Sequence, residues 1–195
     1  MKRIAVLLAL LVMGSCFSMA EDVKINKDNE ILSLALMRSY KDGGYTIVAP
    51  ETRLSHLDLK DPKEIQQTKN YILDNIEVEG YDLNKLLDRF LERNALSVLL
   101  SIKSSPENGY LVDYDRMYEK YFEKNGGGWE QWYKEHPQAH GWTTVSLPAY
   151  DPESKIVLLY IGTQSHWLMG SGYIFVFKYD QGTLKELRRL MLWIS

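Results

Sequence analysis

His136 and His140, in the segment EHPQAHGW, are the first residues of this chain whose types and spacing suggest chemistry. Two histidines four positions apart lie on one face of a helix, which is the arrangement of paired zinc ligands. Pro137 and Gly141 disfavour a helix at this place, and no H-E-x-x-H pattern occurs. We therefore interpret both histidines as loop residues, and we predict neither a metal site nor a cofactor.

The segment GTQSHWLMGSGY, residues 162–173, contains a further candidate, because Ser165 and His166 are adjacent. Neighbours on extended backbone point to opposite faces, so they cannot act on each other as nucleophile and base. The glycines at 170–172 lack the G-x-S-x-G pattern, and no helix start follows them to bind phosphate. Two interpretations stay open: a tight connection between strands, or a loop that holds His166 and Trp167 at the rim of a pocket.

Four carboxylates, Asp113, Asp115, Asp151 and Glu153, could form the acid/base pair of a glycosidase. The segment 151–153, Asp-Pro-Glu, is better explained as a turn, and Asp115 as a helix cap. The chain thus offers no self-consistent catalytic set, which favours a binding protein over an enzyme without deciding between them.

Aromatic residues are concentrated between positions 110 and 142. Tyr114, Tyr118, Tyr121 and Phe122 recur at helical spacing, which is typical of core residues. Tryptophans that flank the glycine run 126–128 are typical of a partner-binding or sugar-stacking surface. Core and binding face both remain open for this region. The candidate binding residues are Trp129, Trp132, His136, His140, Trp142, His166 and Trp167.

The elements that must position these residues change in character near residue 95. Residues 21–95 are predicted as a mainly helical lobe, with a short strand at 45–50. Asp61-Pro62-Lys63-Glu64 combines an N-cap acid, a first-turn proline and a glutamate, which predicts a helix start. A later helix has its apolar stripe within 83–91. Another is expected over 29–40, with an apolar face made of Ile31, Leu34, Ala35 and Met37.

Residues 96–195 are predicted as an antiparallel sheet with two short aromatic helices, at 116–124 and 129–135. Strands at 96–104 and 109–115 are expected to form a hairpin. Four further apolar runs, joined by turn-type sequences, predict a meander over 141–150, 154–163, 171–180 and 184–195. The predicted fold class is α+β, with N-terminal helices packed on one side of a C-terminal antiparallel meander of four or more strands, and both parts in one folded unit.

Three segments, GGGWEQWYKEHPQAHG, GTQSHWLMGSGY and the terminal LWIS, resemble parts of small exported bacterial proteins of undescribed activity. The shared features are a tryptophan-rich segment, a Gly-Ser-Gly-Tyr strand start and a last strand ending in Trp-Ile-Ser. The resemblance covers residues 105–195. It implies a sheet-forming C-terminal domain and brings no catalytic residue with it.

The first twenty residues follow the plan of an export signal, with Lys2 and Arg3 ahead of the apolar run 4–13. That run is shorter than the roughly twenty residues that a membrane-spanning helix needs, so we predict no transmembrane span. Cleavage after Ala20 would give a periplasmic or secreted protein. The alternative is a lipobox cleavage that leaves an acylated Cys16 and anchors the protein to a membrane.

The charge of the predicted mature chain argues against nucleic acid as a partner. Removal of Lys2 and Arg3 lowers the Lys+Arg count from 23 to 21 against 26 Asp+Glu, a formal charge of −5. No basic block of the kind that binds phosphate backbones occurs. We therefore predict an exported, non-catalytic domain that binds a protein or an envelope component through its aromatic loops. The alternative is a periplasmic hydrolase of cell-wall or peptide substrates, which needs His166 or His136 within hydrogen-bond reach of a carboxylate.

Overall fold

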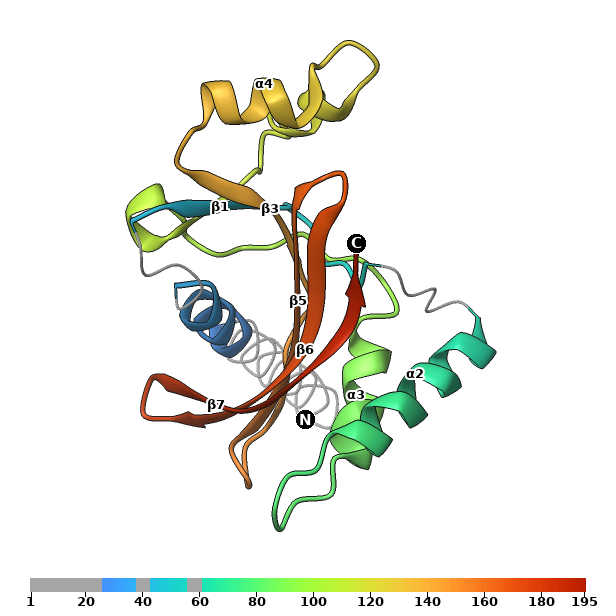
Figure 1. The fold of residues 1–195 in the computed structure, drawn as a ribbon. Coiled ribbons are helices and arrows are strands. Elements are labelled where there is room, and N and C mark those ends of the chain that lie inside the picture. Colours follow the sequence, from blue (N-terminus) through green and yellow to red (C-terminus); the bar gives the residue numbers. More distant parts are fainter. Residues whose placement is uncertain (1–25, 38–42, 56–60) are drawn as a thin grey trace, which may run out of the picture.

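A computed structural model describes residues 26–37, 43–55 and 61–195 of the chain (Figure 1). Its centre is a seven-stranded sheet with the order β2-β1-β3-β5-β6-β7, in which β4 pairs with β5 off this path. The strands are β1 (Tyr45–Val48), β2 (Tyr110–Val112), β3 (Ala139–Val145), β4 (Ala149–Asp151), β5 (Ile156–His166), β6 (Met169–Asp180) and β7 (Thr183–Ile194).

The helices are mostly in the first half of the chain. Residues 26–37 are helical, and α2 (Pro62–Asn75) and α3 (Asn84–Arg93) follow. The second half adds α4 (Gly128–Glu135) and two 3₁₀ turns, Pro106–Asn108 and Glu119–Phe122. The predicted α+β class with a strand-rich C-terminal region is therefore confirmed.

The meander predicted in the second half is present. The strands β3, β5, β6 and β7 pair consecutively and antiparallel, and the β5–β6 register places Leu159 opposite Phe175 and Gly162 opposite Gly172. The sheet is not purely antiparallel, because β1 lies between β2 and β3 and runs parallel to both. This insertion joins a strand of the first half to the sheet of the second.

The hairpin predicted from 96–104 and 109–115 is wrong. Residues 96–104 form no strand; Leu99 makes an isolated bridge with Glu51, and Ser105, in the predicted connection, makes one with Tyr110. The Leu100 amide donates to Pro50 O at 2.8 Å, so this run pairs with the irregular segment after β1. The hairpin fails because β2 pairs with β1 instead.

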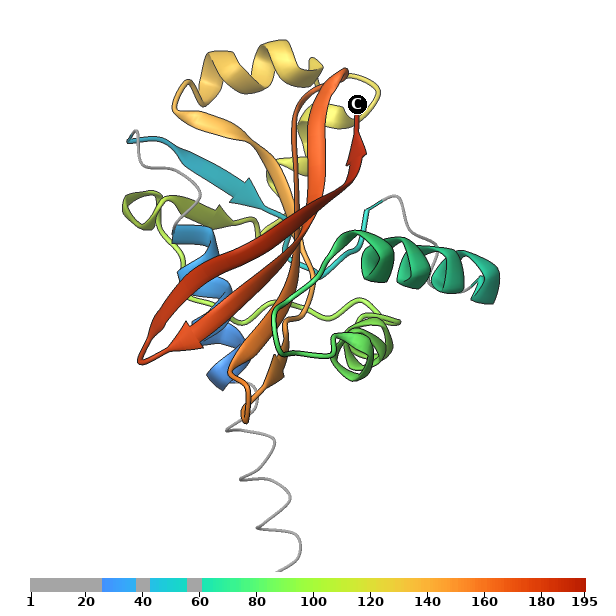
Figure 2. The ribbon, with the colours of Figure 1, turned by 60° about the horizontal axis from the view of Figure 1, so that its bottom comes forward.

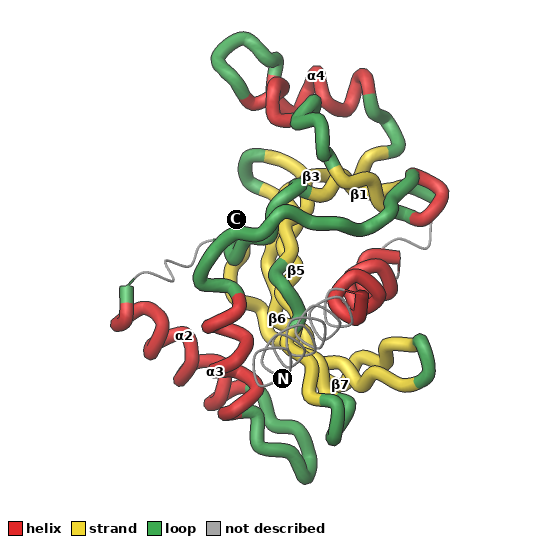
Figure 3. The backbone as a smooth tube through the Cα atoms, turned by 180° about the vertical axis from the view of Figure 1, so that it is seen from behind, coloured by secondary structure: helices red, strands yellow, loops and turns green. Residues whose placement is uncertain are grey.

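Apolar side chains are buried on both faces of the sheet, so the prediction that helices pack on one side is wrong. Val157 and Leu159 of β5 belong to a hydrophobic cluster with the helix at 26–37. Leu158 and Tyr160, which point the other way, belong to a second cluster with α2 and α3. Figures 2 and 3 show the helix at 26–37 and the α2–α3 pair on opposite sides of β5 and β6. A strand buried on both faces needs a continuous apolar run, which β5 has.

The three N-terminal helices match their sequence signals to different degrees. The N-cap is confirmed, because Asp61 Oδ1 accepts a hydrogen bond from the Lys63 amide at 2.8 Å. The α3 stripe is also confirmed, since its apolar residues from Leu83 to Leu91 are buried. The predicted stripe of the first helix is partly wrong. Met37 is 50% exposed and Leu34 half-buried, whereas Ile31, Leu32, Ala35 and Leu36 are buried.

Only one of the two predicted aromatic helices forms at full length. α4 begins at Gly128 and ends at Glu135, as expected, whereas the predicted helix at 116–124 is reduced to the 3₁₀ turn 119–122. Asp113, rather than Asp115, caps this turn region, because its carboxylate accepts the amides of Met117 at 2.8 Å and Tyr118 at 2.9 Å. The two elements pack together at the end of the sheet near β1 and β3 (Figure 1).

The predicted signal peptide at 1–20, with its cleavage after Ala20 or lipidation at Cys16, lies outside the described residues. Within the described ranges, no helix has both the length and the apolar character of a membrane span.

Candidate functional site

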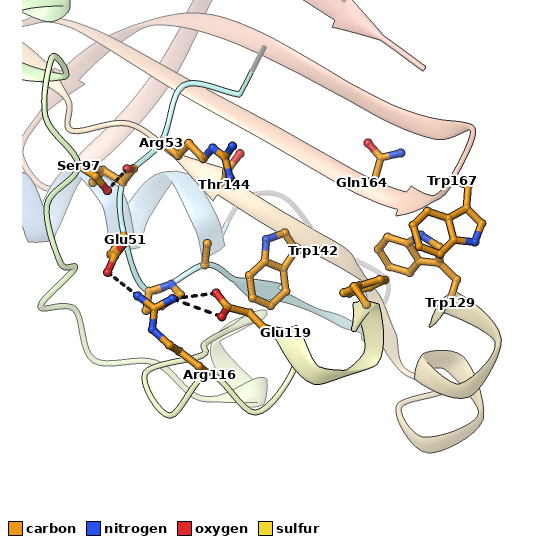
Figure 4. Close-up of a pocket in the computed structure, with 14 residues that line it drawn as sticks. Glu51, Arg53, Ser97, Arg116, Glu119, Trp129, Trp142, Thr144, Gln164 and Trp167 are labelled. Atoms are coloured by element: carbon orange, nitrogen blue, oxygen red, sulfur yellow. Dashed lines mark hydrogen bonds and ion pairs between the residues drawn. The ribbon is translucent and has the colours of Figure 1, made fainter. Parts of the chain in front are cut away.

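A pocket of about 580 Å³ lies where the end of β1 meets β3, β5 and the aromatic region (Figure 4). The segment 49–53 after β1 supplies one side of it, and Trp142, Thr144 and Gln164 project from the sheet. We call this the aromatic pocket. Its lining residues are Ala49, Pro50, Glu51, Thr52, Arg53, Ser97, Arg116, Glu119, Phe122, Trp129, Trp142, Thr144, Gln164 and Trp167.

One end of the aromatic pocket is a wall of rings. Phe122 packs edge-on against Trp129, with ring centroids 4.7 Å apart, and against Trp167 at 5.9 Å. Trp129 is only 3% exposed, whereas Trp167, at the turn between β5 and β6, is 60% exposed. Trp142 is half-buried on β3 and lies between this wall and the charged end (Figure 4). These rings offer a ligand flat apolar surfaces.

The other end of the aromatic pocket carries charge. Arg116 donates to both carboxylate oxygens of Glu119, at 3.0 and 3.3 Å, and its guanidinium also contacts Glu51. The hydrogen bond to Glu119 and the two nearby carboxylates raise the pKa of Arg116. Arg116 has a φ of 53°, a left-handed conformation that few residues other than glycine adopt. Arg116 and its two carboxylate partners form an ion-pair network with a combined formal charge of −1.

Arg53 is the second cation at this end. Its side chain is exposed, and within the described part of the chain it forms no ion pair. Its backbone is fixed, because the Arg53 amide donates to Val145 O at 2.8 Å. This holds residue 53 beside Thr144, toward which its side chain extends in Figure 4. A guanidinium without a carboxylate partner can bind a planar anion through two parallel hydrogen bonds.

His166 lies outside the aromatic pocket but next to it. It lines a second hollow of about 430 Å³, which shares Phe122, Trp129 and Trp167 with the aromatic pocket. The ring wall therefore separates two hollows. Trp167 and His166 lie at the rim of a pocket, the interpretation that the sequence left open beside a plain strand connection. The same segment is also the β5–β6 turn, so the strand connection is present, and a binding role for His166 and Trp167 stays a prediction.

Trp132 lies in the interior of the aromatic cluster, whereas His136 is half-buried at its edge. Trp132 is 0% exposed, and its ring contacts those of Trp129, Tyr118 and Phe122 at centroid distances of 5.3 to 5.6 Å. Its indole Nε1 is buried without a hydrogen-bond partner among the described residues. Trp132 is therefore a core residue, and its burial argues against the predicted role as a binding contact.

His136 belongs to a hydrogen-bonded trio with Tyr121 and Glu135. The Tyr121 hydroxyl donates to Glu135 and lies 3.0 Å from His136 Nε2. Because the phenol has one proton, His136 must donate to it through Nε2, which leaves Nδ1 as the basic nitrogen. Burial lowers the pKa of His136, and burial together with the Glu135 carboxylate raises the pKa of Tyr121 to about 12.

His140 is exposed and lies away from both hollows, at the start of β3, where its ring is close to Gly44. Together with the positions above, this divides the predicted contact residues into three groups. Trp129, Trp142 and Trp167 line one pocket; Trp132 is in the aromatic core, with the half-buried His136 against it; His140 and His166 are exposed at its margins. Among the described residues, no group of three His, Cys, Asp or Glu side chains is placed to hold a metal.

The sequence interpretation missed the polar half of the aromatic pocket. Arg53, Arg116, Glu51 and Glu119 come from two segments that are far apart in the chain. The sequence contains two weak signals for these residues. One is the run Glu51-Thr52-Arg53 directly after a strand and its proline, and the other is the charged loop that carries Arg116 and Glu119 beside the aromatic region. Neither segment indicates a site until β1 is placed beside β3.

Comparison of this chain with models of known protein families, with curated proteins and with solved structures found no match. The geometry of the aromatic pocket is therefore the basis for any functional conclusion.

Proposed function

We propose that the protein is an exported, non-catalytic binding protein that holds an envelope component in the aromatic pocket. The observation that carries the proposal is the pocket itself, about 580 Å³, with a ring wall at one end and a charged network at the other. Pockets of this volume hold small ligands or one segment of a larger one, and pair apolar surface with a few placed polar groups. The leader-like first twenty residues support an exported location.

The carboxylates of the pocket belong to an ion-pair network. Glu51 and Glu119 both contact the Arg116 guanidinium. These contacts hold Arg116 in place, and carboxylate oxygens have further lone pairs that can accept hydrogen bonds from a ligand.

A capture experiment on two neighbouring residues tests the proposal. Trp167 lines the aromatic pocket, whereas Leu168, the next residue on the same turn, is 84% exposed and does not line it. The purified protein is immobilised and incubated with an envelope fraction of its host, and the retained material is quantified. We expect Trp167→Ala to reduce retention about tenfold, which corresponds to a lost contact of about 1.4 kcal/mol, and Leu168→Ala to leave it unchanged.

Equal losses in the two variants would show that the apolar turn, not the pocket, makes the contact. Unchanged retention in Trp167→Ala would refute the pocket as the binding site. Far-ultraviolet circular dichroism of both variants serves as the folding control.

The hydrolase is the second candidate, and the trio of His136, Tyr121 and Glu135 favours it. A general base must lie within hydrogen-bond reach of a partner that orients it, and His136 meets this condition through Tyr121. Under this hypothesis, His136→Gln abolishes release of soluble fragments from cell-wall or peptide substrates, whereas the exposed His140→Gln does not. Absence of any release by the wild-type protein would refute it.

A further inference from the structure

The backbone of the aromatic pocket is already hydrogen-bonded within the protein. The amides of Ala49 and Arg53 donate to carbonyls of β3, and the Thr52 amide donates to Val98 O, each at 2.8 Å. An extended peptide that binds by strand addition needs a row of free backbone groups on the receptor. The segment 49–53 does not offer this row, so recognition in the pocket falls to side chains.

The side chains of the pocket combine flat apolar rings with polar groups beside them. Trp142 and Trp167 present indole surface at the opening, and Trp129 supports Trp167 from behind at a centroid distance of 6.4 Å. A pyranose ring has the complementary surface: its C–H groups form an apolar face, and its hydroxyls point outward at the edge. Indole rings attract such weakly positive C–H groups through their negative faces.

The charges of the pocket indicate where an anion would bind. Arg116 is occupied by Glu119 and Glu51, so it is not available for a strong bidentate bond to a ligand. Arg53 lines the same pocket and has no carboxylate partner in the described part of the chain. Arg53 is therefore the cation of the pocket with which a ligand carboxylate can pair, and Arg–carboxylate pairs are among the strongest hydrogen-bonded contacts.

We propose that the aromatic pocket binds an acidic saccharide, with a pyranose ring against Trp142 and Trp167 and its carboxylate on Arg53. This inference rests on the proposed binding function and names the chemical class of its ligand. The carboxylates of Glu51 and Glu119 accept hydrogen bonds from the sugar hydroxyls. A peptide with a free carboxylate is disfavoured because its backbone would find no partners along 49–53.

The test uses two glycosides that differ only in the charged group. Methyl β-glucuronide carries a carboxylate at C6, and methyl β-glucoside carries a hydroxymethyl group there. Each is titrated into the purified protein, with binding followed by indole fluorescence and by isothermal calorimetry. We expect the glucuronide to bind about tenfold more tightly, the effect of one hydrogen-bonded charge pair. An acidic tripeptide is titrated in parallel.

Variants separate the carboxylate contact from the ring contact. Arg53→Gln should abolish the preference for the glucuronide, so that the two glycosides bind with similar affinity. Arg188→Gln, an exposed arginine on β7 outside the pocket, is the matched control and should keep the preference. Trp167→Ala should weaken both glycosides equally, because both use the same ring face.

Three results would overturn the inference: equal affinity for the two glycosides, a preference that survives Arg53→Gln, or binding of the tripeptide alone. The failure of this inference can be told apart from failure of the proposed function. If neither glycoside binds but envelope capture still depends on Trp167, the pocket binds another class of ligand. If capture also fails, the pocket is not a binding site.

Discussion

Replacing Trp132 with alanine removes the most enclosed ring of the aromatic cluster and tests which tryptophans are structural. Trp132 is 0% exposed and contacts five other rings and His136. A buried tryptophan removes roughly 200 Å² from water, which at about 25 cal/mol per Å² corresponds to about 5 kcal/mol. Its Nε1 has no partner among the described residues, and relief of that unpaired donor returns about 2 kcal/mol. The expected net loss in the free energy of unfolding is about 3 kcal/mol.

The comparison variant is Trp167→Ala, because Trp167 is 60% exposed and loses little on truncation. Its expected cost is about 1 kcal/mol or less. Urea denaturation followed by far-ultraviolet circular dichroism measures both, since fluorescence would change with the tryptophans themselves. With a slope of roughly 2 kcal/mol per molar urea, Trp132→Ala should lower the midpoint by about 1.5 M. Equal midpoint shifts in the two variants would refute the division of these rings into core and pocket wall.

Three further predictions concern pH, packing and processing. Burial lowers the pKa of His136 from 6.5, so as the pH falls the histidine of the unfolded state takes up a proton before that of the folded state does. The free energy of unfolding should therefore decrease as the pH drops below about 6.5. Urea titrations at pH 7.5 and 5.5 should show a smaller difference in His136→Gln than in the wild type. Gly172→Ala should destabilise the protein by about 2 kcal/mol, because a methyl group there overlaps the Trp193 indole; an unchanged melting temperature would contradict this. Intact mass of the protein from its host should show loss of residues 1–20 without acyl mass, and diacylglycerol on Cys16 would contradict cleavage after Ala20.

Elements specified by neighbouring residues were predictable from the sequence. The Asp61 cap, the α3 stripe and the meander from β3 to β7 depend on patterns within a few positions, and each is present. The run 96–104 was misassigned because an apolar extended segment does not specify its partner. Its partner is the irregular segment after β1, which no local pattern indicates.

The candidate site was less predictable because half of it depends on pairing between distant segments. Arg116 and Glu51 are 65 positions apart and meet only because β1 is inserted between β2 and β3. The aromatic half was visible as an enrichment, but enrichment does not separate Trp132 in the core from Trp167 at the surface. That distinction requires knowing that Trp132 is on the face of α4 that packs into the aromatic cluster, whereas Trp167 lies on the exposed turn between β5 and β6.

Hydrogen bonds hold the ring wall and the sheet in fixed positions relative to each other, and this affects the entropic cost of binding a ligand in the pocket. The Tyr133 hydroxyl of α4 donates to Ser165 O at 2.7 Å, and Ser165 Oγ donates to His140 O at 2.8 Å. These bonds connect α4, the start of β3 and the end of β5, so the turn carrying Trp167 is fixed relative to Trp129. A wall fixed before the ligand arrives avoids the ordering cost that a mobile loop would add to binding. A weakly stacking ligand such as a single sugar ring benefits most from that saving, because its own contacts are few.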